Sequence, residues 1–293
     1  MSLNNSYFKN VESLSKKFDS INKMVSKSMG PIYEKLDALS KQITNIFSNS
    51  IFPYLDELGR ELKNVTDDII KFKTIIVELG YPPHEDIAIP DIRRIVADYE
   101  EFGEEYVKSY LDDLMFEIYD EAYLDHILLK WEKIKLFSPR MPILRNIIKC
   151  HTQQMYHASI PTLLPQLEGI IVDTFHHKGT LNTNDLKTYL KYLLINDEEK
   201  LYSFKDALYV YYTKHILVHF EHGKEVNSKI SRHAILHGAI NNYGNKENSL
   251  KLILLFDFLI DCINQIDEQK IILAKKELKK DLYDEQNASQ SSK

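Results

Sequence analysis

The sequence is poor in residues that interrupt helices. Glycine and proline occur nine times each in 293 residues, whereas leucine, lysine and glutamate, which favour helices, are plentiful. No run shows the alternation of apolar and polar residues that is typical of a strand. The sequence therefore predicts an all-α protein.

Cysteine and the common catalytic motifs are also scarce. The two cysteines, Cys150 and Cys262, lie in apolar surroundings and can form neither a disulfide framework nor a cysteine-based zinc site. No HExxH, glycine-rich phosphate loop or GxSxG is present. These absences exclude several enzyme classes by motif, and we expect neither a metal nor a cofactor.

No segment resembles a membrane span or a signal peptide. The most apolar window, residues 249–263, is too short to cross a bilayer and contains Asp257 and Asp261, so we expect a buried helix there. The opening MSLNNSYFKN lacks a basic start followed by an apolar run. We therefore expect a soluble, cytoplasmic protein that does not associate with membranes.

The net charge of −6 argues against sequence-independent nucleic-acid binding by the whole surface, although a local basic patch is compatible with it.

Breaks and apolar spacing divide the chain into four parts. We expect long amphipathic helices over 1–80, a linker and an acidic, aromatic helical region over 81–142, a helical domain over 143–282 and a disordered tail over 283–293. The first part carries a heptad stripe, which fits either a helical hairpin or a coiled coil with a second chain: Ile32, Leu36, Leu39, Ile43, Ile46, Ile51, Leu55, Leu58, Leu62, Val65 and Ile69.

The second part opens with a proline-rich segment. Three prolines within 80–92 predict a non-helical linker. In the acidic region that follows, Trp131 and five tyrosines recur at helical spacing and are expected to line helix–helix contacts: Tyr99, Tyr106, Tyr110, Tyr119 and Tyr123.

The third part is expected to contain five helices. The first is predicted to bend near Pro161 and Pro165, and the second to begin at Asn184 as its cap. The expected ranges are 143–175, 183–194, 197–220, 225–240 and 248–282.

The segment SKISRHAILHGAINNYG, residues 228–244, carries the clearest chemical signal. On a helical wheel the apolar residues gather on one side, and the other side presents nitrogen-bearing groups without any carboxylate: Lys229, Arg232, His233, His237 and Asn241. Arginine suits a phosphate, and histidine suits proton transfer near neutral pH. RNA cleavage by the ribose 2′-hydroxyl needs both functions and no metal, and two facing copies of the helix would supply more such groups around one cleft.

The same residues resemble a known superfamily. Arg232 and His237, with the polar His233 directly after the arginine, fit the Arg-x4-6-His motif of the HEPN superfamily, and RHAILHG…YG…NSLKLILLFDFL is similar to HEPN-type proteins of phage-defence and abortive-infection loci. The resemblance covers about 145–275. It implies a HEPN-type bundle and a metal-independent endoribonuclease acting as a homodimer or higher homo-oligomer, with Arg232 and His237 as the catalytic pair and His233 as polar helper.

Two positions qualify this resemblance. Some family members carry a tyrosine two positions after the histidine, where this chain has Ala239, and Tyr243 is the nearest substitute. Glu168 is an isolated acid in an apolar helix. If it is buried, it requires a cationic partner, for which Arg232 is the natural candidate.

Two alternatives remain open. His215 and His219, four residues apart on an expected helix, could bind zinc or line a groove that stacks unpaired RNA bases. A non-enzymatic helical scaffold, binding RNA or a protein partner, would tolerate loss of Arg232 and His237 but not disruption of the heptad stripe. For the ribonuclease, a regulatory or antitoxin-like protein is a further expected partner.

Overall fold

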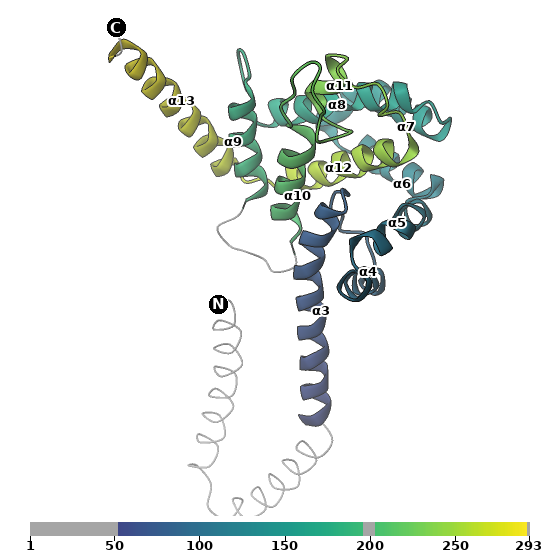
Figure 1. Cartoon of the computed structure of the whole chain (residues 1–293). Helices are drawn as coiled ribbons and strands as arrows, with labels where there is room; N and C mark the ends of the chain where they lie inside the picture. Colours follow the sequence, from purple (N-terminus) through teal and green to yellow (C-terminus); the bar gives the residue numbers. More distant parts are fainter. Residues whose placement is uncertain (1–51, 196–202, 292–293) are drawn as a thin grey trace, which may run out of the picture. The chain divides into compact units, whose positions relative to one another are not determined.

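The computed structural model of the chain describes residues 52–195 and 203–291 (Figure 1). Every regular element in these ranges is a helix, which confirms the all-α prediction. Within the described ranges, no helix has the length and apolar character needed to cross a membrane.

The first described helix, α3 (Phe52–Glu78), carries the second half of the heptad stripe, and Pro53 lies in its first turn, where a proline is tolerated. By the contacts between its residues, the chain divides into two compact units, with the boundary between Asn64 and Val65 inside α3. Ile69 is buried, whereas Leu58 and Leu62 are exposed. The stripe positions from Ile32 to Ile51 lie outside the described residues.

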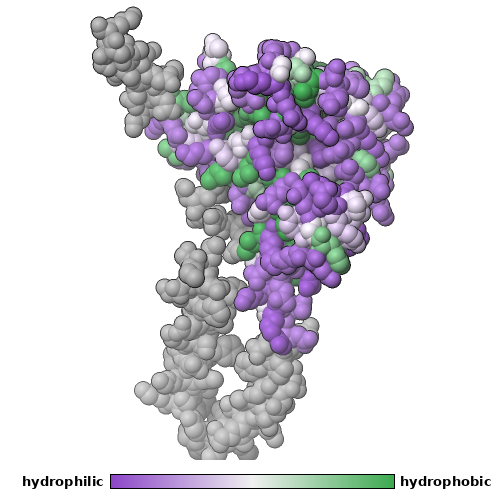
Figure 2. Space-filling view, in the orientation of Figure 1, coloured by the Kyte–Doolittle hydropathy of each residue, from purple (hydrophilic) through white to green (hydrophobic). Residues whose placement is uncertain are grey.

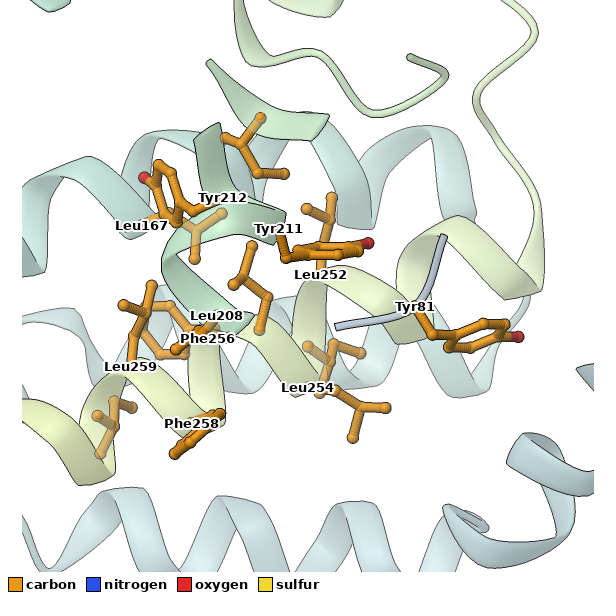
Figure 3. Packing of buried hydrophobic residues seen from close by; sticks show 14 of the residues in the cluster. Tyr81, Leu167, Leu208, Tyr211, Tyr212, Leu252, Leu254, Phe256, Phe258 and Leu259 are labelled. Carbon is orange, nitrogen blue, oxygen red and sulfur yellow. The ribbon is translucent and has the colours of Figure 1, made fainter. Parts of the chain in front are cut away.

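Helix α12 (Lys246–Asn264) forms the centre of the hydrophobic core, because its residues from Asn248 to Ile263 are almost all buried. Helices α7 (Met141–Thr152) and α8 (Tyr156–Thr174) pack against it. A helix that is apolar on all sides must be covered on all sides. Figure 3 shows leucines and phenylalanines of α12 packed with Leu208, Tyr211 and Tyr212. The buried helix predicted over 249–263 is confirmed.

The proline-rich linker is shorter than predicted, and its first part, Tyr81 to His84, is buried, whereas Glu85 and Asp86 are exposed. Helix α4 (Ile89–Phe102) begins inside the predicted 80–92 linker, because Pro90 occupies its first turn, where a missing N–H costs nothing. His84 is only 2% exposed. Helices α5 (Glu104–Ile118) and α6 (Glu121–Glu132) follow.

The predicted aromatic contacts in this region are present in part. Trp131 and Tyr119 are buried in the core. Tyr110 donates a hydrogen bond to Asp98 across the α4–α5 contact at 2.7 Å. Tyr106, by contrast, is 47% exposed and packs on Phe102.

Several predicted boundaries in the third part are wrong. The chain breaks between α7 and α8, where Gln154 adopts a left-handed φ of 60°, and α8 continues through Pro161 and Pro165. Helix α9 (Thr183–Leu194) has its expected range but is capped by Asn182 rather than Asn184, because the Asn182 side chain accepts both Asn184 and Asp185 amides.

The last helices also differ from prediction. A helix was expected over 197–220, of which residues 197–202 lie outside the described ranges. The described part contains only α10 (Lys205–Tyr211) and a short π-helix, the π-turn η3 (Tyr212–Ile216). The final helix is divided into α12 and α13 (Glu268–Ser291), and α13 lies beside α9. Helix α13 continues to Ser291, across residues 283–291 for which a disordered tail was predicted.

Candidate active site on helix α11

Helix α11 (Arg232–Leu236) carries the candidate motif and is five residues long, not the helix predicted over 225–240. Ser231 caps its start, because the Ser231 side chain accepts the Ala234 amide. Gly238, with φ of 70°, ends it. The Ala239 amide donates to the Ala234 carbonyl and the Gly238 amide to the Ile235 carbonyl, which is the glycine-terminated helix end known as the Schellman motif.

Two buried serines fix α11 to the end of the π-turn. Ser228 Oγ donates to the His215 carbonyl at 2.7 Å, and Ser231 Oγ donates to the Val218 carbonyl at 3.1 Å. The loop between η3 and α11 is therefore closed at its base, and α11 has a fixed starting point.

Arg232 is held by an ion pair with helix α8. Its Nη2 atom lies 2.7 Å from Glu168 Oε2, and the two side chains are 21% and 24% exposed. The pairing of Arg232 with Glu168 that the sequence predicted is therefore present. Because both groups keep some access to solvent, the pair sets the position of the guanidinium more than it stabilises the fold.

Two buried polar atoms near this ion pair have no hydrogen-bond partner among the described residues. They are Arg232 Nε and the hydroxyl of Tyr212. Burial raises the pKa of the Tyr212 hydroxyl. The charge of Glu168 raises this pKa further and the charge of Arg232 lowers it, because both charges lie close to the hydroxyl. In Figure 3 the Tyr212 ring points toward the Leu167 side of α8, away from Tyr211. Unpartnered buried groups are uncommon in folded proteins and mark this corner as unusual.

The two histidines of the motif lie on one face of α11, as their spacing predicts. The ring centroids of His233 and His237 are 6.3 Å apart. His237 is exposed, and His233 is half-buried. Burial lowers the pKa of His233, and the positive charges of Arg232 and His237 lower it further. A neutral His233 is therefore favoured near pH 7, and a neutral imidazole can accept a proton.

Three other predicted site residues lie off this helix. Lys229 precedes the Ser231 cap and lies near Lys251. The charge of Lys229 helps to lower the pKa of Lys251. Asn241 lies beyond Gly238, and its carbonyl accepts His157 Nε2 at 3.3 Å. Tyr243 packs on the His157 ring at 5.2 Å. The continuous polar helix face predicted from Lys229 to Asn241 is thus wrong, because Ser231 and Gly238 bound the helix.

An aromatic side chain that the sequence analysis did not single out lies against the motif. The Phe220 ring stacks on His237 with centroids 5.9 Å apart, and it meets the edge of His222 at 5.0 Å. The signal was present in the sequence as His219-Phe220-Glu221-His222. It was overlooked because the predicted 197–220 helix placed Phe220 at a helix end.

The histidine pair considered for zinc is not arranged as expected. His215 is in the π-turn, packed on Tyr211, and burial lowers its pKa to about 4. His219 lies beyond the end of that turn and is exposed, so the helical i, i+4 spacing does not apply. Within 52–195 and 203–291, no group of three or more His, Cys, Asp or Glu side chains could hold a metal ion.

A second polar cluster, around Asp257, lies deep in the core. Asp257 accepts Trp131 Nε1 at 2.7 Å and Lys130 Nζ at 2.7 Å, and its carboxylate lies 3.2 Å from His84 Nε2. Burial raises the pKa of Asp257, but the bonds and charges of His84 and Lys130 outweigh it, so the pKa is lowered. This cluster joins the linker, α6 and α12. The Tyr119 ring packs against His84 at 5.2 Å, and its buried hydroxyl has no hydrogen-bond partner among the described residues.

Comparison of the chain with protein-family models, curated proteins and solved structures found no match.

Proposed function

We propose that this chain is a metal-independent endoribonuclease of the HEPN type, acting in the cytoplasm in phage defence or as a toxin-like effector. The observation that carries the proposal is that Arg232 and His237 stand at opposite ends of one short helix, with the guanidinium positioned by Glu168 and the imidazole exposed. The proposal includes a homodimer, whose paired motifs would share one RNA.

The chemistry follows from the charge and protonation of these groups. Arg232 binds the scissile phosphate and stabilises the negative charge that develops on it. The 2′-hydroxyl attacks the phosphorus atom, the 5′-oxygen leaves, and a 2′,3′-cyclic phosphate forms. His237 accepts the proton of the 2′-hydroxyl and donates a proton to the departing 5′-oxygen, so the step is balanced. His233, which its surroundings favour in the neutral form, supports this role as a hydrogen-bonding group.

The test is cleavage of single-stranded RNA by purified protein in the presence of EDTA. Wild type is expected to yield products ending in 2′,3′-cyclic phosphate, and an oligonucleotide with 2′-O-methyl at every position should remain intact. Cleavage that requires a divalent ion, or that proceeds on the 2′-O-methyl oligonucleotide, contradicts the mechanism.

One observation favours a second candidate, a catalytically inactive helical scaffold. Arg232 already has an anionic partner, Glu168, within the same chain, and such a pair can serve packing alone. A scaffold predicts that cells tolerate overproduction of wild type and of Arg232→Ala equally. The ribonuclease predicts that only wild type slows growth.

A further inference from the structure

Phe220 is an aromatic residue without a packing role in the core. Among the described side chains it belongs neither to the buried cluster nor to the partly buried hydrophobic residues packed against that cluster. Its ring contacts are with His222 and His237, and both of these imidazoles are exposed. A half-exposed phenylalanine in a loop, supported by two solvent-facing rings, offers a flat surface to a planar ligand.

The charge around Phe220 favours an anionic ligand. Residues 214–237 contain four basic side chains, Lys214, Lys224, Lys229 and Arg232, and two acidic ones, Glu221 and Glu225. Glu221 pairs with Lys224, and Glu168 of α8 pairs with Arg232, so basic groups outnumber acidic ones by one. The chain as a whole carries −6. This segment is therefore locally cationic within an acidic protein, as expected where a phosphate approaches.

A second exposed aromatic pair shows what distinguishes this site. Phe102 and Tyr106 pack together with ring centroids 4.7 Å apart and are 54% and 47% exposed. Their neighbours from 98 to 106 include five acids, three of which pair with bases outside that range: Glu100 with Lys71, and Glu104 and Glu105 with Lys108. That surface offers similar rings in acidic surroundings, whereas the Phe220 ring stacks on His237 of the motif.

We propose that Phe220, with the imidazoles of His222 and His237, is a nucleobase-stacking site that receives the base of a nucleotide whose phosphate lies toward Arg232. This rests on the proposed function and names its substrate as unpaired RNA. A base inside a duplex is already stacked on its neighbours and cannot place its face on Phe220, whereas an unpaired base can. Contact of Phe220 with His237 places the stacked base next to the group that transfers protons.

The experiment measures binding separately from cleavage. A fluorescent single-stranded RNA with 2′-O-methyl at every position is titrated with wild type, Phe220→Leu and Phe220→Trp, and anisotropy gives the Kd. Leucine keeps apolar volume without a π face, and we expect it to weaken binding about tenfold or more. Tryptophan should bind at least as tightly as phenylalanine. Phe102→Leu is the matched control and should leave the Kd unchanged.

Further titrations distinguish whether the stacked base belongs to single-stranded RNA, to duplex RNA or to a free nucleotide. A duplex of the same sequence should bind less tightly and lose nothing in Phe220→Leu. A mononucleotide that competes fully with the RNA assigns the site to free nucleotides, whereas competition by the oligonucleotide alone assigns it to RNA. Thermal melts verify that all variants are folded.

The outcomes separate this proposal from the ribonuclease itself. If wild type does not cleave RNA but Phe220→Leu weakens binding, the stacking site stands and the enzymatic function falls. If wild type cleaves and Phe220→Leu changes neither the Kd nor the KM, the stacking site is wrong and the ribonuclease stands. Failure of wild type to bind single-stranded RNA overturns the stacking site.

Discussion

The two polar clusters of the molecule differ in how far their charged side chains are buried. Around Asp257, a fully buried carboxylate receives bonds from three different side chains contributed by the linker and α6. Around Arg232, the ion pair with Glu168 is partly exposed, and buried atoms of Arg232 and Tyr212 lack partners among the described residues. A fully buried carboxylate with three partners fixes the fold, whereas an ion pair that is partly open to solvent remains accessible to a ligand.

The described part of the face seen in Figure 2 is mainly hydrophilic, and its apolar areas are small and separated. The residues that could recognise a ligand chemically are therefore polar or aromatic side chains placed individually. If the two clusters have these different roles, substitutions in the Asp257 cluster should mainly lower the free energy of unfolding, and substitutions in the Arg232 cluster should mainly lower the rate of RNA cleavage.

The largest effect on stability is expected for Asp257→Ala. Removal of the Asp257 carboxylate leaves the buried Trp131 Nε1 and His84 without their acceptor, and it leaves the Lys130 charge without one of its two partners. The free energy of unfolding should therefore fall by about 3–5 kcal/mol. Urea denaturation measures it. The matched control is Asp261→Ala, which also loses a bond to Lys130 but is 34% exposed. It should change stability by less than about 1 kcal/mol. Equal losses in both variants would contradict the structural role of Asp257.

Arg232→Ala should show the opposite balance. We expect RNA cleavage to fall by about 100-fold or more, because the phosphate loses its cationic donor. The free energy of unfolding should fall by no more than about 1 kcal/mol, because the ion pair is partly exposed.

Arg145→Ala is the control for that substitution, since Arg145 pairs with Glu132 at 2.8 Å on the surface. It should retain full cleavage. A comparable loss of cleavage in Arg145→Ala would show that general surface charge, not the α11 site, determines activity.

Buried histidines should make stability depend on pH. Burial lowers the pKa of His151 to about 4, below the value near 6.5 of an unfolded histidine. Between these values the unfolded chain binds more protons, so stability is fully present above about pH 6.5 and decreases as pH falls toward 4. His215 has the same lowered pKa and adds to the decrease.

His151→Gln should reduce this pH dependence. His151 Nδ1 lies 2.8 Å from Ser249 Oγ, and glutamine can keep a bond there without titrating. Denaturation at a series of pH values should give a shallower decrease of the free energy of unfolding between pH 6.5 and 4 in the variant. Parallel curves for variant and wild type would assign the pH dependence to other groups.

The smallest effect is expected for Ser231→Ala. The substitution removes the α11 cap and the bond to the Val218 carbonyl, and should lower the free energy of unfolding by about 1 kcal/mol. Because the same cap sets where Arg232 stands, cleavage should fall as well. Ser109→Ala, which loses only an exposed bond to the Tyr106 carbonyl, is the control and should alter neither quantity. An unchanged cleavage rate in Ser231→Ala would separate the cap from the site.

Local sequence signals predicted the fold class and the central helix but not the candidate site's shape. Continuous apolar character identified α12, and the position of Glu168 in an apolar helix suggested its pairing with Arg232. The length of α11 was wrong although Ser231 and Gly238 are local signals, because the amphipathic wheel was given more weight than the cap and the glycine.

Other features depend on contacts between distant residues, which a single sequence does not reveal. His84 and Trp131 reach Asp257 across 173 and 126 positions of the chain. The closing of the loop by Ser228 depends on the carbonyl of His215, which a predicted continuous helix would have occupied. Phe220 was missed for the same reason, since its contact with His237 forms only when the helix ends early.

The most direct measurement is the single-turnover rate of RNA cleavage in EDTA for wild type, Arg232→Ala and His237→Ala, each at a temperature where denaturation curves show it folded. The account predicts that wild type cleaves and that each variant is slower by about 100-fold or more. A wild type without activity, or either variant cleaving at the wild-type rate, would contradict it.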